Sequence, residues 1–396
     1  MISLHRYREL FEVPQVHAAL GASIVGRLPI GIAGLAILLF VQSRAQSFGL
    51  AGTASALYVL GLASIAPFLG RFMDRFGPRP ILIACGLAYP AALAALAALV
   101  LSGAQAAAVG ASAFVAGASL PPVSACIRAL YPRLIERAEL LQTAYSVDSA
   151  VVELVFIVGP AIVAACMAVG FPEAAIAIAA LSAAIGSGVF ARSPPVAQWM
   201  PARHERPKQR GALGKPGLTV VFATTVLYSI GFGLFEVGVT AHAAAMGAPS
   251  AAGIALALAS VGSCAGAVVY GSRHWAMPLP KQFLAALVAM AAGMLLLVAI
   301  DHLVLYSLAA ILAGVPMATV IATQSLLISR LATRERLAES FTWATTCLLG
   351  GVSAGIALGG WMAEGLAARW LLIAAAGSTA IAAAWVAAAL KSDEKR

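Results

Sequence analysis

The stretch Gly70-Arg71-Phe72-Met73-Asp74-Arg75-Phe76-Gly77-Pro78-Arg79-Pro80 decides the fold of this chain. It places three arginines and one aspartate between two long apolar runs, although only 10% of all residues are charged. Pro78 and Pro80 do not fit inside a regular helix, and Gly77 permits backbone angles that other residues avoid. We therefore predict a tight polar turn that joins two helices and holds its arginines on one side of a membrane.

The composition of the 396 residues extends this prediction to the whole chain. Hydrophobic residues make up 61%, whereas charged residues fall far below the roughly 25% of a soluble protein. Apolar stretches repeatedly exceed the ~18 residues that span a bilayer. The five cysteines all lie inside such stretches and have neither metal-ligand nor disulfide spacing. The sequence predicts an all-α polytopic membrane protein with no metal and no cofactor.

Twelve spans follow from the apolar pattern, with short connections except for one. Residues 192–216 contain five prolines and several basic residues. We read them as a cytosolic linker between an N-terminal six-helix bundle, residues 1–191, and a C-terminal one, residues 217–396. The predicted spans are about 17–42, 50–72, 80–101, 106–130, 142–168, 172–191, 217–245, 250–271, 282–300, 303–329, 339–362 and 368–390.

The basic residues predict the orientation of these spans. With the N-terminus in the cytosol, 22 of the 25 Lys and Arg residues lie in cytosolic loops or at cytosolic helix ends. Arg44 and Arg369 then lie outside, and Arg27 lies within a helix. Because positive residues concentrate on the cytosolic side of membrane proteins, we expect both termini to be cytosolic in a bacterial-type inner membrane. The net charge of +9 then reflects topology and not nucleic-acid binding. We expect a monomer.

The two halves share a short internal repeat. After a shift of 197 residues, identical residues recur in the turn that follows the fourth span of each half, and a glycine recurs in the span itself. This agreement with the span count indicates duplication of a six-helix unit. The matched pairs are Arg133 with Arg330, Leu134 with Leu331, Arg137 with Arg334, Leu140 with Leu337, and Gly117 with Gly314.

With two six-helix halves, the chain resembles the major facilitator superfamily, whose members have this architecture and bind substrate near the midplane of the membrane. The family signature between helices two and three is Gly-x-Leu-Ala-Asp-Arg-x-Gly-Arg-Arg/Lys. Phe72 and Pro78 depart from it, and five residues match it: Gly70, Asp74, Arg75, Gly77 and Arg79. The resemblance implies a gate in which Asp74 pairs with arginines, Arg128 first among them, and with a helix N-terminus of the other half. The alternative is that these charges only set topology.

A second, partial motif lies in helix five. Gly159-Pro160 resembles the signature of the drug–proton antiporter branches, although Val163 and Ala164 replace the expected glycines. The resemblance favours export over import.

Charged residues lie deep inside three predicted spans: Arg27 midway along the first, Glu153 midway along the fifth and Glu236 in the outer half of the seventh. A charge at the bilayer centre costs roughly 2.5–3.5 kcal/mol on insertion scales. The resemblance implies that helices one, four, seven and ten line a central cavity, which favours Arg27 and Glu236 as cavity residues. Glu153 or Glu236 is then a candidate proton carrier, and the alternative is a static buried ion pair. Tyr228 and Gln324 are candidates for the substrate surface.

No nucleophile–base pair and no phosphate-binding Gly-Lys-Ser/Thr loop occurs in the sequence, so we expect neither an enzyme nor ATP-driven transport. The expected function is secondary active transport by alternating access, as proton-coupled efflux of small amphipathic or drug-like molecules. The runner-up is uptake of a small organic anion anchored by Arg27. A membrane sensor or scaffold that transports nothing is the alternative from another class.

Overall fold

The computed structural model describes residues 5–199, 215–248 and 251–393. Every regular element in these ranges is a helix. Most of the predicted linker, residues 200–214, lies outside the described residues. The α-helices are α1 (His5–Glu12), α2 (Val16–Ala45), α3 (Phe48–Phe76), α4 (Pro78–Leu101), α5 (Ala106–Ala118), α6 (Val123–Leu134), α7 (Ala138–Ala168), α8 (Pro172–Arg192), α9 (Pro194–Ala197), α10 (Pro216–Ala245), α11 (Ala251–Ser272), α12 (Leu279–Leu296), α13 (Leu303–Leu331), α14 (Leu337–Gly365) and α15 (Ala368–Asp393).

The long helices are apolar on all sides. Twelve spans in the described residues are long and apolar enough to cross a membrane. Large side chains such as Leu87, Leu181 and Trp361 are well exposed on the outside of the bundle. A helix that is hydrophobic all round and still exposed fits a lipid environment. The predicted all-α fold with twelve spans is confirmed.

One local prediction was wrong. The fourth span was expected as one helix over 106–130, but it breaks into α5 and α6 between Ser119 and Pro122. Pro121 and Pro122 have no backbone N–H to continue the helical hydrogen-bond ladder. Within the range of the expected linker, Pro194–Ala197 forms the short helix α9, where Val196 is buried.

Glycines bring the helices into close contact, and they do so in the same way in both halves. A Cβ on Gly61 of α3 would overlap the carbonyl of Phe114 on α5, and Gly262 of α11 stands in the same relation to Ile311 on α13. Gly117 and Gly314, matched in the sequence, likewise abut the carbonyls of Tyr58 and Ala259. Small residues allow this close approach in membrane bundles. The equivalent residues are 201 apart in α3 and α11 and 197 apart in α5 and α13.

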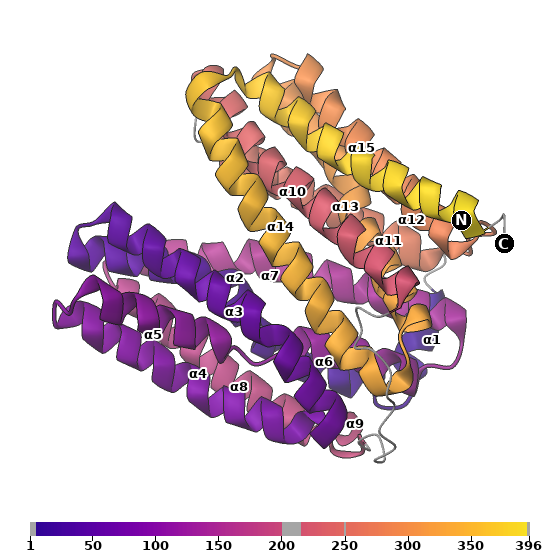
Figure 1. Ribbon diagram of the computed structural model, residues 1–396, viewed down its shortest axis with the longest axis horizontal. Helices are drawn as coiled ribbons and strands as arrows, with labels where there is room; N and C mark the ends of the chain where they lie inside the picture. The colour runs from indigo at the N-terminus through magenta and orange to yellow at the C-terminus, as the bar shows by residue number, and fades with distance from the viewer. Residues whose placement is uncertain (1–4, 200–214, 249–250, 394–396) are drawn as a thin grey trace.

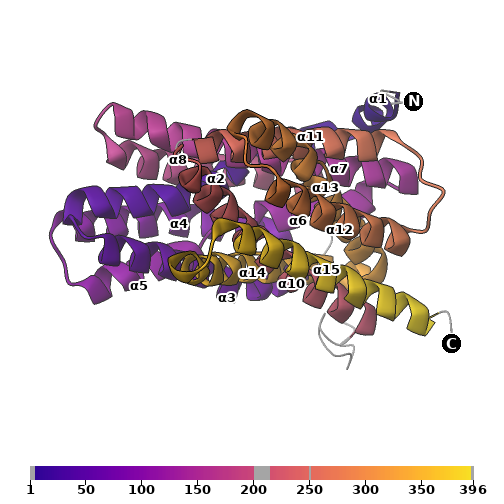
Figure 2. The same cartoon turned by 90° about the horizontal axis from the view of Figure 1, so that it is seen from above.

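The two six-helix bundles converge at one end and diverge toward the other (Figure 1). The helices meet through α3 with α14, α6 with α14, and α7 with α11 and α13. Both ends of the described chain lie at the convergent end (Figures 1 and 2). We call this end, which carries α1, the α3–α4 turn at Gly77 and the start of α14, the terminal face.

Candidate functional site

The turn that opened the sequence analysis joins the two halves at the terminal face. The carboxylate of Asp74, at the end of α3, accepts hydrogen bonds from the backbone N–H groups of Ala338 (3.2 Å) and Glu339 (2.8 Å). These are among the first residues of α14, whose own preceding residue, Arg336, provides no side-chain cap. Asp74 therefore caps a helix of the other half. Such a carboxylate satisfies free N–H groups and interacts favourably with the helix dipole.

Steric limits explain why both glycines of the motif, Gly70 and Gly77, are glycines at this junction. A Cβ on Gly70 would overlap the hydroxyl of Thr342 and lie 2.8 Å from the carbonyl oxygen of Ala338. Gly77 ends α3 and precedes α4 with a φ of 83°, which side-chain-bearing residues rarely adopt. Gly70 thus lets α3 touch α14, and Gly77 makes the turn.

Charged pairs surround the capping contact. Arg71 donates to Glu339 at 2.7 Å, and Arg133 donates to the carbonyl of Arg334 at 2.9 Å, so each bond crosses between the halves. The expectation that Arg128 pairs with Asp74 was wrong. Arg128 instead binds Asp148, because α6 directs it toward α7 and away from the end of α3.

The two exposed arginines of the motif make fewer polar contacts with described residues than Arg71 does. Arg75 and Arg79 are exposed, and the guanidinium of Arg75 lies over the ring of Phe76, 5.0 Å from its centroid. Neither side chain takes part in an ion pair with a described residue.

A second, related junction joins α7 of the first half to α11 of the second. Here side chains donate to backbone carbonyls, whereas Asp74 accepts from backbone N–H groups. Gly271 of α11 packs on Ser146 of α7 as Gly70 packs on Thr342. Gln142 donates to the carbonyls of Tyr270 (2.8 Å) and Arg273 (3.2 Å), and Thr143 donates to that of Gly271 (2.8 Å). Here side chains of the first half bind backbone carbonyls of the second.

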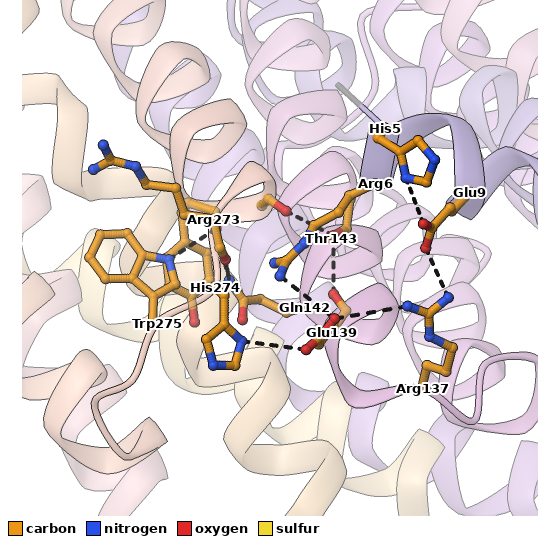
Figure 3. Close-up of polar contacts among 12 residues, drawn as sticks. His5, Arg6, Glu9, Arg137, Glu139, Gln142, Thr143, Arg273, His274 and Trp275 are labelled. Carbon is orange, nitrogen blue, oxygen red and sulfur yellow. Dashed lines mark hydrogen bonds and ion pairs between the residues drawn. The ribbon is translucent and has the colours of Figure 1, made fainter. Parts of the chain in front are cut away.

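The short helix α1 lies against this second junction (Figure 3). Glu9 accepts from Arg137 at 2.8 Å, and Arg6 lies 3.6 Å from Glu139. The Tyr7 hydroxyl donates to the carbonyl of Val268 on α11 at 2.7 Å. Burial raises the pKa of Tyr7 to about 12, so its hydroxyl stays protonated at neutral pH. His274 of the second half approaches Glu139 of the first at 3.4 Å.

Arg27, predicted in the cavity, is instead sealed inside the first half. Its side chain is 1% exposed and forms an ion pair with Asp148, which also accepts from Arg128 at 2.6 Å. Two arginines therefore share one carboxylate, and Nε and one terminal nitrogen of Arg27 have no hydrogen-bond partner among the described residues. Asp148 was not among the predicted site residues. The sequence signal for this ion pair was the presence of an arginine, Arg27, in one span and an aspartate, Asp148, in another.

Glu153 lies near the middle of α7 and contacts the other half. Its carboxylate accepts a 2.8 Å hydrogen bond from the hydroxyl of Ser263 on α11. The hydroxyl oxygen of Ser263 in turn accepts a 2.9 Å hydrogen bond from the backbone N–H of Ala318 on α13. Glu236, in α10, is half-buried, and its carboxylate has no hydrogen bond or ion pair within the described ranges. The structure thus brings neither glutamate to Arg27.

Two further predicted residues do lie together. Tyr228 of α10 donates to the side-chain oxygen of Gln324 on α13, and both are buried. Gly159 packs against the backbone of Gly31 on α2, and Pro160 follows within α7. In the described part of the chain, no group of three His, Cys, Asp or Glu residues is placed to hold a metal ion.

The side-chain bonds between the halves run from mid-helix to the terminal face. The outermost are Glu153 with Ser263 and Thr346 of α14 with the carbonyl of Ala63 on α3, at 2.7 Å. A bundle closed at one end and divergent at the other is the geometry of an alternating-access transporter. The sequence model of the Major Facilitator Superfamily matches residues 19–273.

The chain belongs to the major facilitator superfamily. It is therefore a multi-pass membrane protein of a transporter family and not an enzyme, as predicted. No curated protein sequence matches the chain.

Solved structures of this superfamily share the fold over nearly the whole chain. A bacterial homologue of the iron transporter ferroportin, in an outward-facing state, has a TM-score of 0.75 at 14% identity, covering 93% of this chain and 98% of the other. The human organic anion transporter MFSD10 has 0.69 at 15% identity, covering 94% and 99%. The proton:xylose symporter XylE has 0.68 at 13% identity, covering 94% of both chains.

Proposed function

We propose that the protein is a proton-coupled secondary transporter that exports small amphipathic or drug-like molecules by alternating access. The supporting observation is the contact between Glu153 and Ser263. It joins a carboxylate of one half to the other half near the middle of the membrane. An ionisable residue at this depth costs free energy, and such residues in membrane proteins usually serve a function in transport. Hydrogen bonds to an ionised carboxylate are roughly twice as strong as neutral ones. Protonation of Glu153 therefore weakens a bond that holds the halves together.

The terminal face is the cytosolic face in this proposal. The arginines of the α3–α4 turn, the turn after α6 and the start of α14 all lie there, as the excess of basic residues on the cytosolic side requires. The structure then corresponds to an outward-facing state, closed toward the cytosol by Asp74 and its partners. Export is favoured by the partial antiporter motif at Gly159-Pro160.

Uptake of a small organic anion is the second candidate. Arg27 and Arg128 share a single carboxylate, so the cluster with Asp148 carries a net positive charge. The likeness to a human organic anion transporter is compatible with this function. Arg128 is the member of the cluster that keeps some exposure, 13% of its side chain.

Flux through reconstituted vesicles distinguishes these functions. We expect an imposed pH gradient to drive amphipathic dyes in the export direction, and Glu153→Gln to abolish the response to the gradient. Accumulation of organic acids that depends on Arg128 would instead support anion uptake. Absence of any substrate-dependent flux across a dye and organic-acid panel would leave only the sensor or scaffold function.

A further inference from the structure

The helix α1 contacts both halves of the transporter. Through Glu9 and Arg6 it binds Arg137 and Glu139, which begin the first half's α7. Through the Tyr7 hydroxyl it binds the carbonyl of Val268, in the second half's α11. Leu10 on the same helix is 1% exposed, so α1 is also anchored by an apolar side chain. Figure 3 shows Arg6, Arg137 and His274 directed at Glu139, with Glu9 beside Arg137.

The internal repeat shows which contact of the first junction is missing at the second, where α1 lies. With the offset that relates Gly70 to Gly271, the residue equivalent to Asp74 is Trp275, beyond the end of α11 at Ser272. The second half therefore lacks the capping carboxylate. Its junction has neutral hydrogen bonds from Gln142 and Thr143 and the contact of His274 with Glu139. The helix α1 lies beside it with two acidic–basic pairs.

We propose that α1 is a releasable strap that takes the place of the missing carboxylate in the second half and stabilises the closed terminal face. Opening this face separates α7 from α11. The helix α1 cannot keep both Arg137 and Val268 during that movement, so either the Tyr7 bond or the charged pairs must break. The strap thus sets how often the transporter faces inward. This inference rests on the alternating-access function proposed above.

Distances across the terminal face test the strap without any transport assay. Spin labels are attached to Arg79→Cys at the start of α4 and Met277→Cys after α11, both exposed, in the full chain with its native cysteines replaced by alanine. Double electron–electron resonance then reports the closed and open populations. Tyr7→Phe removes one hydrogen bond of roughly 1 kcal/mol, so the open-to-closed ratio is expected to rise about fivefold.

A second variant and a control sharpen the result. Tyr7→Phe combined with Glu9→Gln also removes the pair with Arg137. Because Tyr7→Phe alone already cuts the link to α11, the ratio is expected to stay at about fivefold in the double variant. Arg8→Ala is the matched control, because Arg8 lies on α1 but, among the described residues, binds only Glu12 of the same helix, at 3.0 Å. It is expected to leave the distances unchanged.

The outcomes separate the strap from the proposed function. Unchanged distances in Tyr7→Phe and the double variant, with a shift in Asp74→Asn, would overturn the strap and leave alternating access standing. An equal shift in Arg8→Ala would also overturn it, since the effect would then come from α1 in general. A single fixed distance in every variant, Asp74→Asn included, would contradict the alternating-access function itself.

Discussion

The carboxylate of Asp74, at the end of α3, accepts a 2.8 Å hydrogen bond from the backbone N–H of Glu339, at the start of α14. One residue of the first half thereby caps a helix of the second. This contact can exist only while the terminal face is closed, so it links the conformational state of the transporter to a single side chain.

Asp74→Asn is expected to lower transport at least tenfold without loss of protein from the membrane. Asparagine keeps the size of the side chain but has no charge to interact with the helix dipole, a contribution of up to about 2 kcal/mol. Initial flux rates, normalised to membrane-inserted protein, measure the effect. Arg79→Gln is the control, because Arg79 is exposed on the same turn. Normal flux in Asp74→Asn would rule out the gating role.

Gly70→Ala and Gly271→Ala are expected to weaken closure of the terminal face. The added Cβ would lie 2.8 Å from the carbonyl oxygen of Ala338 in the first case and 2.7 Å from Cβ of Ser146 in the second, so the helices must move apart. Gly377→Ala is the matched control, since nothing lies within 4 Å of its Cβ position. Labelling of cysteines introduced at the terminal face, from the side that is cytosolic in the proposed orientation, reports the opening. Equal labelling in all three variants would contradict the steric argument.

Glu153→Gln is expected to uncouple transport from the pH gradient while downhill flux persists. Glutamine can still accept from Ser263 but cannot carry a proton at any relevant pH. Glu236→Gln is the comparison, because Glu236 has no bond to the other half among the described residues. Flux is measured with and without an imposed gradient. Loss of coupling in Glu236→Gln alone would move the proton site to α10, and full coupling in both variants would refute a proton-carrying role for either.

Asp148→Asn is expected to destabilise the protein more than Arg27→Gln. The first change leaves both Arg27 and Arg128 without a carboxylate, whereas the second leaves one intact pair. Removing one partner of a buried pair typically costs about 3–5 kcal/mol. Thermal unfolding of the detergent-solubilised protein gives the order. A larger loss in Arg27→Gln would show that Arg27 has another partner.

Much of the α3–α4 turn and of the junction at Asp74 could be predicted from sequence because its parts are local. Gly77 makes a turn that its own backbone angles require, and Asp74 occupies a fixed place in that turn. Arg128 was assigned the wrong partner. Its position in the chain shows that it is near the membrane edge, but the direction of its side chain depends on how α6 packs after the break at Pro121 and Pro122.

By itself, the sequence determined the membrane spans, their number and the turn at Gly70–Pro80, because apolar length and the backbone limits of glycine and proline act within one segment. Only the tertiary structure decided which charges meet. Arg27 is paired with Asp148 and not with a glutamate, Glu153 reaches Ser263 in the other half, and α1 joins α7 to α11. These pairings are set by how helices distant in sequence rotate and cross, and no single segment carries that information.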